Sequence, residues 1–279
     1  NKLYLLLITL FLSSYFYSIV EEDPLPTLGD YSSASISLSG EYELGRLWLA
    51  MYRGSTKEHS DPLMRTYLED LIYRLSETSE VRDRRFEFII LEDESINAFA
   101  APGGIIGINL GMFLNTQREG ELASVMCHEL AHLSQRHYAR SQNRSSPLAN
   151  ALMILASIAV AAASRNPEAI VIAPAAMQQM SINYTRSNER EADRIGFNNL
   201  VKAGFDPNDM TMMFQRMQDK YQRDDSEQFS YLMTHPLPSE RLTDMRIRAD
   251  NISKPSEGSF RDNLDFYFMQ KRSEIWAEK

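Results

Sequence analysis

The chain has 279 residues, of which 43% are hydrophobic and 24% are charged, and its formal net charge is −9. This length and composition allow one compact domain with a sizeable core and short appendages. The acidic balance, without a cluster of lysine and arginine, argues against nucleic acid as a partner. The single cysteine, Cys127, excludes an internal disulfide and a cysteine-rich zinc finger.

The N-terminal segment has the features of a secretory signal. Lys2 precedes an uncharged, apolar run over residues 3–20, in the order of the basic and apolar regions of a signal peptide. No A-x-A-like triplet marks a cleavage site, so a retained single-span anchor over residues 1–20 is an alternative. Either interpretation predicts that most of the chain lies outside the cytoplasm. Residues 21–38, rich in serine, proline and acidic groups, are expected to form a linker.

Helices and strands alternate in the first half of the chain. Apolar spacing predicts helices near residues 40–53, 61–77 and 118–140, and strands near 85–91 and within 95–109. Asp61-Pro62 is typical of an N-cap followed by a proline in the first turn. Pro102-Gly103-Gly104 is typical of a turn between two short strands. A small sheet is therefore expected directly before the helix at 118–140.

The second half is predicted to be helical throughout. Residues 147–180 are apolar apart from a break at 164–168, and each arm is too short for a comfortable membrane span. They predict a buried helical hairpin, with a hairpin that touches a membrane surface as the alternative. Further helices are expected at 182–204, 207–222, 237–253 and 262–277. The predicted fold class is α+β and mainly helical.

The most informative stretch is His128-Glu129-Leu130-Ala131-His132. Residues four apart share a helix face, so both histidines can bind one cation. Glu129 lies about 100° round the helix, where it can reach a water held by the metal instead of the metal itself. The alternative is two surface histidines on an ordinary helix, which the apolar flanks of this motif make less attractive.

A catalytic zinc site needs a third protein ligand. A histidine at position 138 would complete the metzincin pattern, but that position is Tyr138 and Gln135 replaces the required glycine. His137 is about 140° off the ligand face of a continuous helix. We therefore expect it at the surface or beside a ligand.

A carboxylate is the better candidate for the third ligand. Glu189 and Asp193 share one face of a predicted helix, one turn apart. Glu189 can bind the metal while Asp193 accepts the distal N–H of a liganding histidine, which fixes its tautomer. Glu191 points elsewhere on this helix and is expected to be a solvated charge.

Four motifs follow one another, at residues 97–104, 128–132, 189–193 and 235–241. With these motifs the sequence resembles the gluzincin metallopeptidases of the HtpX, OMA and BepA group over residues 40–253. The resemblance implies one Zn²⁺ held by His128, His132 and Glu189, with Glu129 as general base. The short apolar hairpin between the ligands looks more like the periplasmic BepA (β-barrel assembly-enhancing) proteases than like relatives with true spanning helices there.

The resemblance also implies an organisation and a function. A gluzincin-type zinc peptidase domain is expected at 39–253, with a small β-sheet beside the metal helix. Residues 254–279 are expected to form a C-terminal helix, where BepA-type proteins continue into repeats. The expected function is a periplasmic zinc endopeptidase that degrades unfolded or misassembled envelope proteins. Expected partners are such polypeptides and the outer-membrane assembly machinery, with peripheral membrane contact through 147–180.

Two further groups of residues have expected roles at the site. His235 is expected to approach the open zinc position, where it either blocks that position or stabilises the oxyanion, while Arg241 orients the loop or supplies charge. The alternative is that the loop at His235 simply caps a helix that begins near Pro238, and that Glu240 and Arg241 are surface charges. The strand at Asn97, Ala98 and Phe99 is expected to pair with an extended substrate through main-chain hydrogen bonds.

Two other functional classes stay open. A chaperone-like assembly factor with latent protease activity would use the same strand to hold polypeptides. An aminopeptidase-like enzyme is the second, but in that family the third ligand follows the second histidine much more closely than Glu189 follows His132 here. An endopeptidase is therefore the preferred interpretation.

Overall fold

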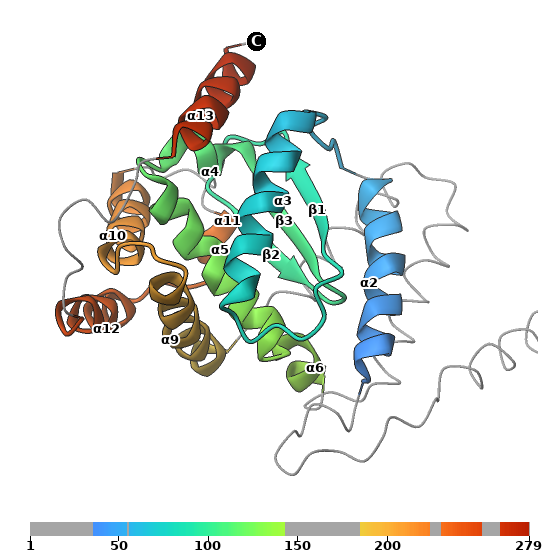
Figure 1. Ribbon diagram of the computed structural model, residues 1–279, viewed down its shortest axis with the longest axis horizontal. Helices are drawn as coiled ribbons and strands as arrows, with labels where there is room; N and C mark the ends of the chain where they lie inside the picture. Colours follow the sequence, from blue (N-terminus) through green and yellow to red (C-terminus); the bar gives the residue numbers. More distant parts are fainter. Residues whose placement is uncertain (1–35, 55, 143–184, 224–229, 253–262, 279) are drawn as a thin grey trace, which may run out of the picture.

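The computed structural model describes residues 36–54, 56–142, 185–223, 230–252 and 263–278. Within these ranges a small sheet is surrounded by helices (Figure 1). The strands are β1 (Glu87–Leu91), β2 (Ala98–Ala101) and β3 (Ile105–Asn109). The helices are α2 (Leu38–Arg53), α3 (Pro62–Glu77), α4 (Leu110–Asn115), α5 (Glu119–Ser134), α6 (His137–Gln142), α9 (Arg186–Lys202), α10 (Asn208–Arg223), α11 (Ser230–Thr234), α12 (Ser239–Asp250) and α13 (Leu264–Ala277).

The sheet has the strand order β1-β3-β2. Strands β1 and β3 are parallel, whereas β2 and β3 are antiparallel, with Ala100 opposite Ile106. The tight connection between β2 and β3 depends on Gly103 and Gly104, whose φ angles of 75° and 77° are in the left-handed region that favours glycine. The two strands joined at Pro-Gly-Gly are thus present, and β2 is an edge strand of this sheet.

The two faces of the sheet are covered by different helices. Because successive side chains of a strand point to opposite faces, Phe88 and Ile90 join the main core while Ile89 packs on the other side. On that other side α2 supplies Trp48, which meets the ring of Phe99 edge-on. Figure 1 shows α2 on one side of the sheet and α3 with α5 on the opposite side.

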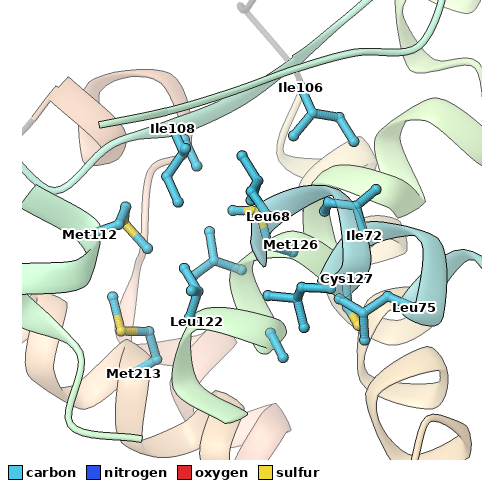
Figure 2. Packing of buried hydrophobic residues seen from close by; sticks show 14 of the residues in the cluster. Leu68, Ile72, Leu75, Ile106, Ile108, Met112, Leu122, Met126, Cys127 and Met213 are labelled. Carbon is cyan, nitrogen blue, oxygen red and sulfur yellow. The ribbon is translucent and has the colours of Figure 1, made fainter. Parts of the chain in front are cut away.

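The main core lies between the sheet, α3, α5 and α10. Figure 2 shows side chains from all of these elements interdigitating. They include Leu68, Ile72, Leu75, Ile106, Ile108, Leu122, Met126, Cys127 and Met213. Cys127 is fully buried, and burial raises the pKa of its thiol, so it acts as a small apolar residue of this core. Burial on this scale holds α5 rigidly across the sheet.

Within the described residues, the sequence-based helices are confirmed except in one place. The helix expected at 118–140 is wrong as one continuous element, because α5 ends at Ser134 and α6 begins at His137. Arg136 has a φ of 51° and breaks the helix. Its guanidinium bonds the side chain of Glu41 and the carbonyl of Ile36, contacts that a periodicity argument cannot see.

Other expectations fall partly outside the described residues. The N-terminal segment 1–20, most of the linker and the apolar segment 147–180 lie outside them. The described C-terminal part forms α13, which packs against α3 and α4. Across the described ranges, none of the helices combines the length and apolar character that a membrane span requires.

Candidate metal centre

The site is built where α9 packs along α5 (Figure 1). The two helices lie close together at Gly196, where an added Cβ would lie 3.0 Å from the backbone of Cys127 and from the Cα of His128. Because a Cβ contact of 3.0 Å is tighter than nearly all ordinary ones, the absence of a side chain at Gly196 favours this close packing of the two backbones. Glu189 and Asp193 lie seven and three residues before Gly196, on the same face of α9, so the close contact brings both carboxylates to the histidines of α5.

Three donor groups from two helices converge on one point. The Nε2 atoms of His128 and His132 are 3.0 Å apart, and each lies 3.4 Å from a carboxylate oxygen of Glu189. Ligands about 2.05 Å from a tetrahedral zinc ion are about 3.3 Å from one another. The observed separations therefore suit a cation of this kind, and all three side chains are buried.

The loop after α11 contributes a fourth donor to the same cluster. His235 Nδ1 lies 3.1 Å from both carboxylate oxygens of Glu189 and 3.3 Å from His128 Nε2. Its ring stacks on Tyr231 of α11, with centroids 4.5 Å apart and an interplanar angle of 22°. The donor atoms of His128, His132, Glu189 and His235 all lie within 4.8 Å of one another. His235 thus stands where a fourth ligand would.

Glu129 is adjacent to this cluster and separate from the four donors. Its side chain is fully buried, and neither carboxylate oxygen meets hydrogen-bond geometry with any partner in the described ranges. One ionisable neighbour is His235, whose Nε2 lies 3.6 Å from Glu129 Oε1. Burial raises the pKa of Glu129, against the lowering influence of His235 and His128. A buried carboxylate of raised pKa beside a donor cluster is suited to accept a proton.

Asp193 and Arg241 hold the donors in place. Asp193 Oδ1 lies 3.0 Å from His128 Nδ1, an ion-pair distance, although the two atoms are not aligned as a hydrogen bond. Arg241 donates to both oxygens of Asp193 at 2.6 and 2.7 Å, and its Nη1 lies 2.9 Å from Glu189. The same Nη1 donates to the carbonyl of Pro236, which tethers the loop that carries His235. One buried guanidinium therefore joins both carboxylates of α9 to this loop.

The charges in the cluster shift its pKa values in opposite directions. Burial alone would lower the pKa of His128, but Asp193 and Glu189 raise it to about 9. Burial lowers the pKa of His132 well below the usual value, and Glu189 only partly opposes this. Burial would raise the pKa of Glu189, yet the histidines around it hold that pKa far below its ordinary range. A carboxylate kept ionised among imidazoles is a suitable environment for a cation.

His137 takes the second of its two predicted positions, beside a ligand, whereas Glu191 has partners that the sequence-based interpretation did not expect. His137 is buried, and its Nδ1 lies 2.8 Å from Nδ1 of His132. Its Nε2 lies 3.2 Å from Glu191, which also accepts from Arg140 at 2.9 Å. Glu191 is partly exposed, as predicted for a solvated charge, but it also pairs with His137 and Arg140, which the prediction did not include. The expected offset of about 140° between His137 and the ligand face applies only to an unbroken helix. Because the chain turns at Arg136, His137 returns to the side of His132.

The predicted substrate strand lies against α5. Asn97, Ala98 and Phe99 are all buried, and the ring of Phe99 points toward α2, away from the metal helix. The carbonyl of Asn97 accepts from the amide of Asn109, which anchors the start of β2. In this conformation these side chains are closed to a substrate, so only the main chain of the edge strand could serve for pairing.

The fold is that of a gluzincin-type metallopeptidase. One helix carries His128 and His132, an adjacent helix supplies Glu189, and a small sheet lies beside them. The family model for Peptidase family M48 matches residues 62–249. The chain belongs to this family.

Curated relatives agree with this membership. The putative beta-barrel assembly-enhancing protease of Vibrio cholerae is 41% identical over 242 residues, covering 83% of this chain and 49% of that protein. The beta-barrel assembly-enhancing protease of Escherichia coli (strain K12) is 36% identical over 258 residues, covering 90% of this chain and 52% of that protein. The mitochondrial metalloendopeptidase OMA1 of Schizosaccharomyces pombe is 24% identical over 234 residues, covering 82% and 66%. The chain spans about half the length of these bacterial relatives.

Proposed function

We propose that this protein is a zinc-dependent endopeptidase. The observation that carries the proposal is the buried cluster of two imidazoles and one carboxylate, with separations of 3.0 to 3.4 Å, beside the buried carboxylate of Glu129. Two nitrogens and one oxygen are a donor set that zinc accepts in hydrolytic sites. Membership of Peptidase family M48 supports the same conclusion.

The residues divide the work in the following way. His128, His132 and Glu189 hold the ion, which when bound supplies Lewis-acid chemistry and makes water a stronger nucleophile. Glu129 takes a proton from the attacking water and then delivers it to the leaving amine. Arg241 holds the carboxylates of Asp193 and Glu189 in fixed positions, so that the ligands keep their geometry during turnover.

The proposed substrate is an extended stretch of unfolded polypeptide. Strand β2 is an edge of the described sheet and packs on the metal helix, so a segment added to that edge would run past the donor cluster. Main-chain pairing at Asn97, Ala98 and Phe99 requires an unfolded or partly folded substrate, because only such a chain offers free backbone groups.

The test is metal content together with cleavage of casein, with and without a chelator. We expect about one zinc ion per chain and chelator-sensitive cleavage within the casein chain. An N-terminally blocked peptide should be cleaved as well as a free one, which separates an endopeptidase from an aminopeptidase. A preparation that binds no zinc at micromolar concentrations contradicts the proposal.

Glu129→Gln tests the general base. We expect this variant to keep zinc and to lose cleavage by about 10²- to 10⁴-fold, the usual contribution of a general base. Glu77→Gln is the matched control, because Glu77 is exposed at the end of α3 and distant in the chain from the metal motifs. Cleavage by Glu129→Gln at the parental rate would show that another group accepts the proton.

A second candidate, an assembly factor with latent protease activity, is favoured by the position of His235. Its Nδ1 lies 3.1 Å from Glu189, at the place where water or a substrate carbonyl would approach the ion. Protease activity would then appear only when the loop from His235 to Arg241 moves away. Unfolded outer-membrane protein that is held without cleavage by the parental chain, and is cleaved by His235→Ala, would favour this candidate.

The proposed setting is the bacterial envelope. The bacterial relatives carry names that refer to β-barrel assembly, and the basic and apolar N-terminal residues are typical of an exported chain. We infer a periplasmic location, unfolded or misassembled envelope proteins as substrates, and contact with the outer-membrane assembly machinery. Residues 147–180 are the candidate for peripheral membrane contact.

A further inference from the structure

Each of the two histidine ligands has a partner on its distal ring nitrogen, and the partners differ. His128 faces Asp193 directly, at 3.0 Å. His132 instead faces a second imidazole, that of His137, at 2.8 Å between the two Nδ1 atoms. His137 in turn faces Glu191 of α9 through its Nε2. Helix α9 therefore contacts both ligand histidines. It contacts His128 directly through Asp193, and His132 indirectly through Glu191 and the ring of His137.

The protons of this chain of groups can be assigned from donor and acceptor chemistry. A carboxylate only accepts, so Glu191 requires the hydrogen of a neutral His137 to be on Nε2. Nδ1 of His137 then carries a lone pair and must accept. The nitrogen 2.8 Å away, Nδ1 of His132, therefore donates, which leaves the lone pair of His132 on Nε2. That is the nitrogen directed at the donor cluster.

We propose that His137 and Glu191 are positioning residues that set the tautomer and ring orientation of His132 for metal binding. This inference rests on the proposed zinc site. His137 is fully buried and lies on α6, which the turn at Arg136 directs back beneath the end of α5. Arg140 holds the carboxylate of Glu191 from the solvent side at 2.9 Å. Partners of this kind typically change metal affinity by about 10- to 100-fold when they are removed.

The experiment measures zinc affinity by competition with a chromophoric chelator, in the full chain carrying Glu129→Gln to prevent self-cleavage. We expect His137→Phe to raise the zinc dissociation constant by about 10- to 100-fold. His137→Gln should recover most of the affinity, because its amide oxygen can accept from His132. Glu191→Ala should weaken binding in the same direction by a smaller factor. Ser141→Ala on α6 is the control and should bind like the parent, because its hydroxyl bonds the carbonyl of Tyr138 on its own helix instead of a group of the donor cluster.

A second measurement is independent of the metal. Nitrogen-15 shifts of the histidine rings in the metal-free protein should report the Nδ1–H tautomer for His132 and the Nε2–H tautomer for His137. In Glu191→Ala the hydrogen of His137 should no longer be fixed on Nε2, because the carboxylate that accepts it is removed. Thermal unfolding of the metal-free variants separates a folding defect in His137→Phe from lost affinity.

The outcomes distinguish the two proposals. Parental zinc affinity in both His137→Phe and Glu191→Ala would overturn the positioning role and leave the zinc site standing. An Nε2–H tautomer of His132 in the metal-free parent would do the same. A parental chain that binds no zinc would overturn the zinc site and this inference together.

Discussion

The close approach of α9 to α5 at Gly196 makes a quantitative prediction for Gly196→Ala. The added methyl carbon would lie 3.0 Å from the carbonyl group of Cys127 and from the Cα of His128. These are backbone atoms of a buried helix and cannot rotate away, so the two helices must separate by a few tenths of an ångström. Overpacking of this kind costs about 1–3 kcal/mol.

A matched glycine isolates this cost. Gly54, at the end of α2, has a φ of −73°, and a methyl group added there would have its nearest neighbouring atom 3.4 Å away, an ordinary contact. Both substitutions restrict the unfolded chain equally, which favours folding by about 0.4–1 kcal/mol. The difference between the two variants therefore measures the helix contact alone. We expect Gly196→Ala to be less stable than Gly54→Ala by about 1–3 kcal/mol.

The assay is urea denaturation of both variants and the parent in the presence of a chelator, followed by zinc competition. Because Gly196 lies on the face that carries Glu189 and Asp193, separation of the helices should also move Glu189 away from His128. Zinc affinity should fall in Gly196→Ala and stay unchanged in Gly54→Ala. Equal stability and equal zinc affinity of the two variants would refute the close-packing argument.

Three further predictions follow from the buried charges. Arg241→Ala should destabilise the metal-free protein by about 3–5 kcal/mol, since it leaves Asp193 and Glu189 buried without their cation; a loss below about 1 kcal/mol in urea denaturation would contradict this. His235→Ala should raise the rate of casein cleavage and weaken zinc binding, and no change in either measurement would contradict the blocking role. Burial raises the pKa of Asp209 from 3.8 to about 7. The folded state therefore keeps this proton to higher pH than the unfolded state does. The stability that results is full below pH 3.8 and is lost as the pH rises through about 7. Asp209→Asn should therefore gain stability relative to the parent as the pH rises from about 4 to about 7, and a difference in unfolding free energy that stays constant over that range would contradict the shift.

Local patterns in the sequence were sufficient for the elements that carry the site. Apolar spacing predicted α3, β1 and α9 with bounds close to those observed, and Pro-Gly-Gly predicted the turn between β2 and β3. These features depend on neighbouring residues alone, through helical and strand periods and the special backbone freedom of glycine. The spacing of the two histidines on one helix face, and of Glu189 with Asp193 on another, follows from the same periods.

The convergence of groups from distant segments was decided by the tertiary structure. The side chain of Arg136, at the turn that directs His137 toward His132, bonds Glu41, which is 95 residues away in the chain. The position of His235 Nδ1 among the donors depends on the loop that Arg241 ties to Asp193. Short-range periodicity carries no information about such contacts, because their energies come from burial and charge pairing between elements that meet only in the folded chain. The sequence by itself therefore determined which residues can bind a metal, and the packing of α9 on α5 decided which of them meet.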